Sequence, residues 1–220
     1  MKKTAILLGA TGLTGSKLLQ LLLQDDRFQK VVVLTRRSTH ISHEKLEEHI
    51  IDLFSLEEYP VLFQAADVVF CCIGTTKAKT PDKELYYRID HGIPVATARM
   101  TKKNNIPTFI VISAVGANSK SRFSYNRIKG EMERDVLELD IKNTYILQPS
   151  LISGDREEKR TGENLAEKLM QVFDFFIPSK LKIISADTIA KAMLHIAHHG
   201  YKSSIIPSDE IHVIENMTAP

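Results

Sequence analysis

Short apolar runs alternate with longer amphipathic stretches along most of the chain. Six runs are rich in Ile, Val and Leu and lack a regular polar alternation. They are residues 5–9, 31–35, 49–52, 68–73, 108–113 and 144–148. Continuous apolar strands are typical of a parallel sheet that is buried on both faces. The runs therefore predict parallel strands with helices above and below them.

The stretches between these runs have the spacing of helices. Residues 13–24 and 126–139 place their apolar side chains on one helical face. Residues 81–104 also read as helical, but Pro94 lies inside them and predicts a kink or a break near Gly92.

Beyond Gln148 the pattern loosens. It predicts helices at 163–176 and 186–199, the second with Ser185 as its N-cap, and a last strand at 211–214. The simplest interpretation is a single α/β domain over residues 1–220, with a doubly wound (Rossmann) parallel sheet and helices on both faces. Residues 150–220 form a small C-terminal elaboration that covers the substrate side.

Composition narrows the class of protein. The chain has 220 residues, 25% of them charged, and a formal net charge of +2 that is spread along the whole length. This favours no nucleic-acid partner and no anionic membrane surface, and no apolar run is long enough to span a membrane. The only two cysteines, Cys71 and Cys72, are adjacent in an apolar run, which suits neither a disulfide nor a metal site. They predict a reducing compartment and a cytoplasmic location.

A glycine-rich segment, GATGLTG, joins the first predicted strand to the first predicted helix. Its glycines, in the form GxxGxxG, allow a tight turn, a close approach of the backbone to a pyrophosphate, and close packing of helix on strand. The helix then directs free N–H groups at the anion. This context predicts a dinucleotide site made by Gly9, Thr11, Gly12, Leu13, Thr14 and Gly15.

The residues after the second strand bear on the choice of cofactor. An acidic side chain there would hold the ribose hydroxyls of NAD, but the chain has Arg36 and Arg37. A guanidinium suits the 2′-phosphate of NADP, although both arginines could simply be solvated in a loop. Asp52, at the end of the third strand, is a candidate to bond the adenine or to cap the next turn.

Tyr125 and Lys129 stand four residues apart at the start of a predicted helix, so they share a face. A nearby ammonium stabilises a phenolate, which would bring a weak acid closer to its working range. Ser113, at the end of the fifth strand, is placed to bond a substrate oxygen. Together the three could polarise a carbonyl or accept an alcohol proton.

These motifs resemble the short-chain dehydrogenase/reductase superfamily. Three further segments are similar to its atypical NADP-binding branch, which includes the Tat-interacting proteins: CCIGTT at 71–76, YNRIKGE at 125–131 and QPSLISGDR at 148–156. The resemblance extends over most of the chain.

The resemblance implies that Tyr125 is the acid/base, that Lys129 holds the nicotinamide ribose and tunes the phenol, and that Ser113 binds the reacting oxygen. It also places four more residues on the cofactor: Gly74 and Thr75 along its length, and Pro149 and Ser150 beside the nicotinamide. Many members carry a relay asparagine on the fourth helix, where this chain has Asp90 as its nearest candidate.

Three functions remain open from sequence. The first is an NADP-dependent oxidoreductase acting on a small carbonyl or alcohol, without a metal. The second is an NADP(H)-binding regulatory protein with little turnover, read by a protein partner; a homodimer is also open. The third, a sugar-nucleotide epimerase or dehydratase, normally needs a larger C-terminal substrate domain than follows Gln148 here.

Overall fold

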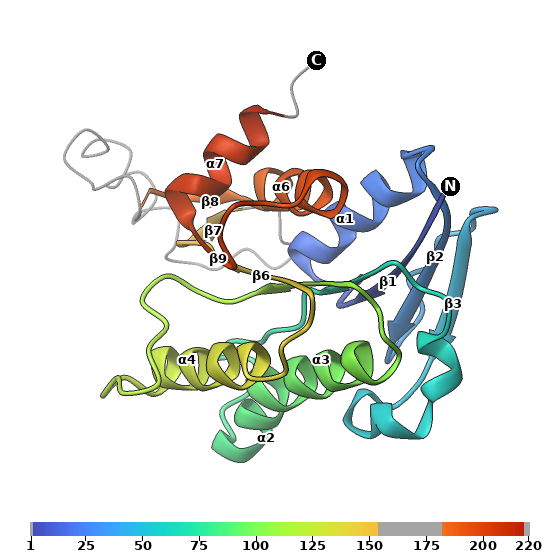
Figure 1. Ribbon diagram of the computed structural model, residues 1–220. Helices are drawn as coiled ribbons and strands as arrows, with labels where there is room; N and C mark the ends of the chain where they lie inside the picture. The colour runs from blue at the N-terminus through green and yellow to red at the C-terminus, as the bar shows by residue number, and fades with distance from the viewer. Residues whose placement is uncertain (1, 154–181, 218–220) are drawn as a thin grey trace.

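The computed structural model describes residues 2–153 and 182–217, and seven parallel strands form its main sheet. The strand order is β3-β2-β1-β4-β5-β6-β9 (Figure 1). The strands are β1 (Lys3–Leu8), β2 (Phe28–Thr35), β3 (Leu46–Ile50), β4 (Val68–Cys71), β5 (Thr108–Ile112), β6 (Asn143–Gln148) and β9 (Ile205–Pro207). The order reverses direction between β1 and β4, which is the switch point at which doubly wound folds bind ligands.

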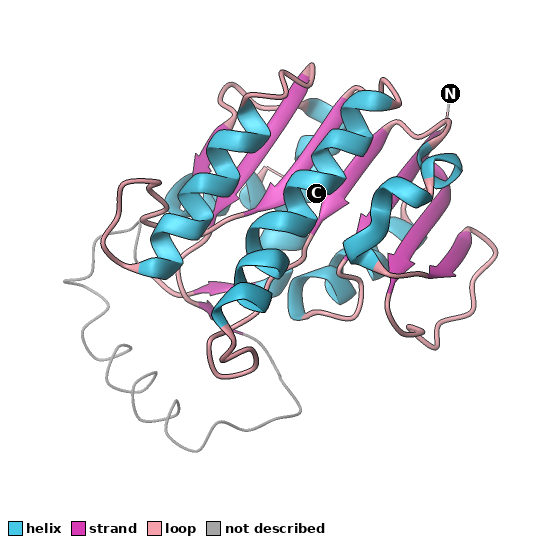
Figure 2. Ribbon diagram, turned by 90° about the horizontal axis from the view of Figure 1, so that it is seen from below, coloured by secondary structure: helices cyan, strands magenta, loops and turns pink. Residues whose placement is uncertain are grey.

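Helices cover both faces of this sheet (Figure 1). One face carries α1 (Leu13–Gln24), α6 (Ala186–His199) and α7 (Ser208–Asn216). The other carries α2 (Lys83–Tyr87), α3 (Ile93–Lys103) and α4 (Ser124–Leu137), with the short turns η1 (Leu53–Glu58), η2 (Pro60–Phe63) and η3 (Arg88–Gly92). Figure 2 shows helices lying side by side over the sheet, roughly along the strands. A separate two-stranded ladder joins β7 (Ile152–Ser153) to β8 (Ile184–Ser185).

The strands bury both of their faces. In β1, Ala5 and Leu7 belong to the core beneath α1 and α6, whereas Ile6 and Leu8 belong to the core beneath α3 and α4. All four side chains are fully buried, and neighbouring residues of a strand point to opposite faces. The unbroken apolar runs in the sequence have this cause, and the predicted Rossmann-like architecture is confirmed.

The predicted helix at 81–104 is built of three pieces. α2 and α3 are joined without a break by η3, a turn of π-helix that ends at Gly92. Pro94 lies in the first turn of α3, where its missing N–H is tolerated. The expected irregularity near Gly92 is therefore a π turn, a feature that is frequent at functional sites.

Two element predictions differ from the structure. Residues 211–214 are helical, in α7, and the last strand is β9, a few residues earlier. Ile211 and Ile214 are both fully buried at helical spacing, and a short apolar run does not by itself distinguish strand from helix. The third strand, β3, begins earlier than the apolar run that predicts it. The residues of β3 are mostly half-exposed and several are polar, so an apolar pattern does not mark its bounds.

Several C-terminal predictions concern the same region. Ser185 is the N-cap of α6, as predicted, since its Oγ accepts the Thr188 N–H at 3.0 Å. The helix predicted at 163–176 lies outside the described residues, as does much of the segment 150–220 that we expect to cover the substrate side.

Candidate cofactor and catalytic site

The glycine loop turns sharply between β1 and α1. Gly9 has a φ of +86°, a conformation open to glycine but costly for other residues. The Gly12 N–H donates to the Gly9 carbonyl at 2.9 Å and closes the turn. The chain therefore leaves the carboxyl end of β1 and enters the helix within a few residues.

Two glycines of the loop have no room for a side chain. A Cβ on Gly15 would lie 2.0 Å from the Gly9 carbonyl oxygen. A Cβ on Gly9 would lie 2.7 Å from the Cys72 carbonyl group, directly after β4. The close packing of helix on strand that the GxxGxxG pattern predicts is thus present.

The N-terminus of α1 presents backbone donors without a side-chain cap. Gly12 is its N-cap, and the first turn carries no acidic residue. Thr11 and Gly12 are exposed, whereas Thr14 and Gly15 are buried against the sheet. An uncapped helix start with open backbone in front of it is suited to an anion.

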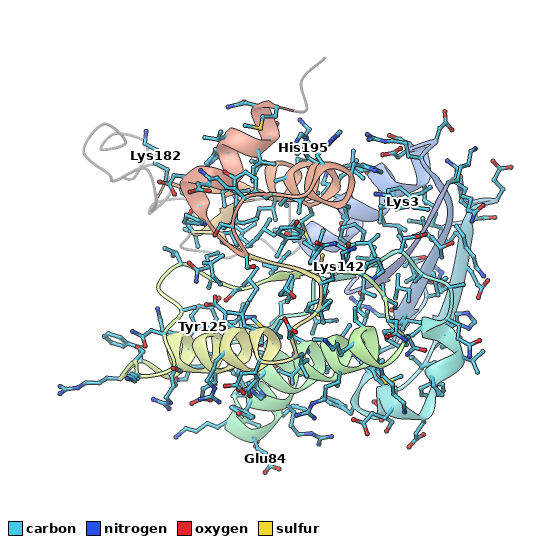
Figure 3. The ribbon with its side chains drawn as sticks, in the orientation of Figure 1. Lys3, Glu84, Tyr125, Lys142, Lys182 and His195 are labelled. Carbon is cyan, nitrogen blue, oxygen red and sulfur yellow. The ribbon has the colours of Figure 1, made fainter. Side chains whose placement is uncertain are left out.

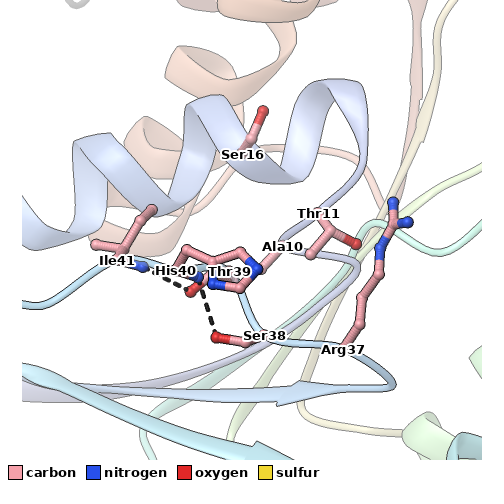
Figure 4. A pocket seen from close by; sticks show the side chains of 8 residues that line it. All are labelled: Ala10, Thr11, Ser16, Arg37, Ser38, Thr39, His40 and Ile41. Atoms are coloured by element: carbon pink, nitrogen blue, oxygen red, sulfur yellow. Dashed lines mark hydrogen bonds between the residues drawn. The ribbon is translucent and has the colours of Figure 1, made fainter.

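A partly open pocket of about 360 Å³ lies beside this loop (Figure 4). Its walls come from the glycine loop and α1 on one side and from the segment after β2 on the other. They are Ala10, Thr11, Ser16, Arg37, Ser38, Thr39, His40 and Ile41. Arg37 and Arg36 are both exposed, and Arg37 reaches the pocket while Arg36 is not among its walls.

Asp52 lies after β3 and is exposed. One of its carboxylate oxygens accepts the Phe54 N–H at 2.9 Å, so Asp52 caps η1. The capping role that the sequence left open is present. Contact with an adenine stays a prediction.

Ser113 lies just past the end of β5, Tyr125 at the start of α4, and Lys129 one turn further into α4. Ser113 directly follows β5, is 4% exposed, and donates its N–H to Leu147 of β6 at 2.7 Å. Tyr125 lies in the first turn of α4 (Figure 3) and is 42% exposed. Lys129 follows one turn later and is 3% exposed. Tyr125 is thus partly open to solvent as a residue, whereas Lys129 is buried.

The buried Lys129 ammonium is paired with Asp90 of η3. Its Nζ lies 2.9 Å from Asp90 Oδ1, and the Asp90 side chain is 1% exposed. The second oxygen, Oδ2, accepts the Thr75 N–H at 2.9 Å. The Thr75 hydroxyl bonds Thr80 at 2.9 Å. Asp90 thus joins α4 to the loop after β4, where exposed Gly74 lies beside both charges.

This pairing changes the electrostatics of the phenol. Desolvation raises the pKa of Tyr125, Lys129 lowers it and Asp90 raises it, so that the pKa lies above its ordinary value. Desolvation lowers the pKa of Lys129, but Asp90, Tyr125 and Cys71 together raise it above its ordinary value, so the ammonium is held in its charged form. The tyrosine-lysine spacing alone suggests a pKa of the phenol below its ordinary value.

Glu133, which the sequence reasoning missed, lies behind Ser113. It is one turn beyond Lys129 on the same face of α4 and is 8% exposed. Gln148 donates its amide N–H groups to both carboxylate oxygens, at 2.9 and 3.0 Å. Burial raises the pKa of Glu133 although Ser113 and Gln148 both oppose this. Its i,i+4 spacing from Lys129 was the available signal.

Pro149 and Ser150 follow β6 and are buried. The Pro149 carbonyl accepts the Val115 N–H at 2.9 Å, which ties together the segments after β5 and β6. Ser150 donates its hydroxyl to the Lys182 carbonyl and accepts the Ser208 hydroxyl at 3.3 Å. The structure therefore gives Ser150 a local bonding role, and its contact with a cofactor stays a prediction.

The residues present fit a nicotinamide dinucleotide. The cradle at Gly9 and Gly15 would be filled by any Cβ, the start of α1 is uncapped, and the adjoining pocket carries an arginine. Within residues 2–153 and 182–217, no three His, Cys, Asp or Glu side chains gather as a metal site would require. No helix in the same ranges is both long and apolar enough to cross a membrane.

Comparison with known proteins places these features in a family. Residues 9–199 match the family model described as NAD(P)H-binding. Protein HTATIP2 of Rattus norvegicus is 35% identical over 76% of this chain and 69% of its own length. Protein FMP52-1, mitochondrial, of Scheffersomyces stipitis is 30% identical over 94% of this chain and 92% of its own. The resemblance to the Tat-interacting proteins is confirmed.

Solved structures share the fold at low identity. MoeE5 in complex with UDP-glucose and NAD superposes with a TM-score of 0.69 at 15% identity, over 98% of this chain and 82% of that one. A short chain dehydrogenase family protein from Francisella tularensis has a TM-score of 0.65 at 15% identity, over 97% and 99%. At this identity the likeness carries the fold alone.

The prediction of a cytoplasmic location is wrong, because relatives such as FMP52-1 are named as mitochondrial proteins. It rested on the two cysteines, which are both free, Cys71 buried and Cys72 half-buried. Burial raises the pKa of Cys71 to about 11, so its thiol is inert by environment. An inert buried thiol carries no information about the compartment. The matched family model and the two groups of relatives lead to one conclusion: this chain belongs to the NAD(P)H-binding family that includes HTATIP2 and FMP52.

Proposed function

We propose that this chain is an NADP-dependent oxidoreductase of the short-chain dehydrogenase/reductase type, which transfers hydride to a small carbonyl compound or from the corresponding alcohol. One observation carries the proposal. The glycine loop, Gly74, Ser113 and Pro149 all follow the carboxyl ends of adjacent strands, with Tyr125 at the start of the next helix. This is the edge, at the switch point, where such folds hold a dinucleotide and its substrate.

Each residue has a role in this proposal. A bound NADP(H) supplies or takes the hydride. Tyr125 exchanges a proton with the reacting oxygen, and Ser113 holds that oxygen by a hydrogen bond. Lys129 holds the ribose side of the site and carries a positive charge next to the phenol. The loop over 9–15 receives the pyrophosphate on backbone N–H groups.

The preference for NADP over NAD rests on the segment after β2. Arg36 and Arg37 are exposed there, and Arg37 lines the pocket with Ser38 and Thr39. A phosphate on the 2′ position gains charge-assisted hydrogen bonds from such a group, worth about 1.5–3 kcal/mol each. We therefore infer that NADPH binds about tenfold or more tightly than NADH.

Thermal unfolding with each nucleotide tests the cofactor. At a hundred times its dissociation constant, a ligand stabilises the fold by about 2.7 kcal/mol, or about 5–11 °C for a chain of this size. Arg37→Gln should remove the preference for NADPH and leave the shift with NADH unchanged. Arg99→Gln, at an exposed arginine of α3, is the matched control. Equal shifts with NADPH and NADH in the native protein would contradict the preference.

Turnover tests the chemistry. Oxidation of NADPH is followed against a panel of aldehydes, ketones and quinones, with Tyr125→Phe as the variant that lacks the acid. The variant should lose turnover and keep the thermal shift. A shift with NADPH but no turnover on any carbonyl would favour the second function, an NADP(H)-binding regulatory protein. If Tyr125→Phe is as active as the native protein, Tyr125 is not the acid.

A further inference from the structure

Asp90 is the most deeply buried charged side chain in the candidate site, and the roles given above do not use it. It lies in the π turn η3, and it is 1% exposed. Its Oδ1 meets Lys129 Nζ at 2.9 Å and its Oδ2 accepts the Thr75 N–H at 2.9 Å. A carboxylate buried to this degree requires a charged or hydrogen-bonding partner for each oxygen, and these partners fix the position of the Asp90 side chain.

The position of Asp90 determines the net charge that the Lys129–Asp90 pair presents to the Tyr125 phenol. A lysine ammonium that faced the phenol alone would stabilise the phenolate. Here the same ammonium is paired at contact distance with a carboxylate, so the pair presents a much smaller net charge to the phenol than Lys129 would. The partial burial of the site gives this neutralisation more weight than it would have in water.

We propose that Asp90 is a positioning residue that offsets the charge of Lys129 and thereby keeps Tyr125 protonated at neutral pH, so that the site works as a carbonyl reductase. This rests on the proposed function and adds its direction. In reduction, a C–H bond forms at the carbonyl carbon with the hydride that a bound NADPH would supply; a nicotinamide C–H bond would break and NADP⁺ would remain. The phenol O–H bond breaks as its proton passes to the carbonyl oxygen, so that the carbonyl is reduced to the alcohol. The phenolate then regains a proton from solvent. Oxidation of an alcohol requires the phenolate, which this arrangement disfavours.

Other titratable groups also face the pair. Tyr86 of α2 interacts electrostatically with Asp90 and Tyr125, and its own pKa is raised, first by desolvation and then by these two groups. Cys71 of β4 faces Lys129. Glu133 of α4 interacts electrostatically with Lys129. Tyr86 and Cys71 are neutral at neutral pH, so Asp90 is the one buried anion in direct contact with the ammonium among the residues that the structure describes.

The test is the titration of the Tyr125 phenol in the protein without nucleotide. Tyrosine labelled with ¹³C at the ring carbon that bears the hydroxyl gives one signal for each of the six tyrosines, and Tyr125→Phe identifies the relevant one. In Asp90→Asn the signal should titrate at lower pH than in the native protein. Asp82→Asn is the matched control: it removes an exposed carboxylate from the start of α2 and keeps a side chain that can cap the helix.

A second pair of variants keeps the test decisive if Asp90→Asn does not fold, since that variant leaves Lys129 buried without its partner. Lys129→Gln should move the Tyr125 titration to higher pH. Adding Asp90→Asn to Lys129→Gln should move it back down, because the carboxylate then acts on the phenol alone. If removal of the carboxylate leaves the titration unchanged or moves it upward in either background, the proposal is overturned.

The two proposals fail separately. The titration needs neither cofactor nor substrate, so it can succeed even if NADPH does not bind. Where the carbonyl panel yields a substrate, the pH profile gives a second readout: oxidation of the product alcohol should reach its optimum at higher pH than reduction does. Asp90→Asn should move the oxidation optimum to lower pH. Coincident optima in the native protein would contradict a reductive direction.

Discussion

Gly15→Ala tests the packing on which the dinucleotide loop depends. The new Cβ would lie 2.0 Å from the Gly9 carbonyl oxygen, about 1.4 Å inside an ordinary contact, which begins at 3.4 Å. That oxygen also accepts the Gly12 N–H that closes the turn. We assign about 3 kcal/mol to the overpacking and about 1 kcal/mol to the strained hydrogen bond, less about 1 kcal/mol for the better helix propensity of alanine. The net loss is about 3 kcal/mol.

Gly92→Ala is the matched control. Gly92 is also helical, but its Cβ would find its nearest neighbour at 4.0 Å, so only the helix propensity changes. Thermal unfolding of the two variants should give a melting temperature about 6–12 °C below the native value for Gly15→Ala and about 1–4 °C above it for Gly92→Ala. Gly15→Ala should also lose most of its stabilisation by NADPH. A Gly15→Ala protein with native melting temperature and native NADPH response would refute the reasoning.

Three further predictions concern stability. Burial would raise the pKa of Asp25, but hydrogen bonds from Arg27 and contact with His198 lower it to about 2. About 2 kcal/mol of the free energy of unfolding should therefore be lost as the pH falls from about 4 to 2. Acid unfolding of Asp25→Asn should show a smaller loss over this range. Because the pKa of Glu133 is raised in the folded state, its protonated form favours folding. Stability should therefore fall as the pH rises from 4.5 through the folded pKa, and a urea series on Glu133→Gln should lack that slope. Ser185→Ala removes the N-cap of α6 and should cost about 1 kcal/mol in the same assay.

The sheet and the loop could be predicted because their signals are local. Each central strand buries both faces, which leaves an unbroken apolar run, and each loop glycine has a steric reason that the pattern GxxGxxG carries. The end of the chain was harder. Ile211 and Ile214 are buried residues of α7 itself, and a short apolar run such as theirs fits a strand as well as a helix. The third strand is predicted at 49–52 but lies at Leu46–Ile50, because the residues of an edge strand need not be apolar.

The part of the candidate site around Tyr125 could be predicted only as a list of residues, because its electrostatics are set by contacts between distant segments. Lys129 and Tyr125 are close in sequence, so their pairing was visible. The Lys129–Asp90 pair joins residues 39 positions apart, and it depends on a π turn whose only trace in the sequence is Pro94. Sequence spacing indicates which side chains can come into contact, whereas burial and pairing determine which charges dominate the pKa of a neighbouring group. The same tyrosine-lysine motif can therefore serve a proton donor in one chain and a proton acceptor in another, and the residue that distinguishes them need not belong to the motif.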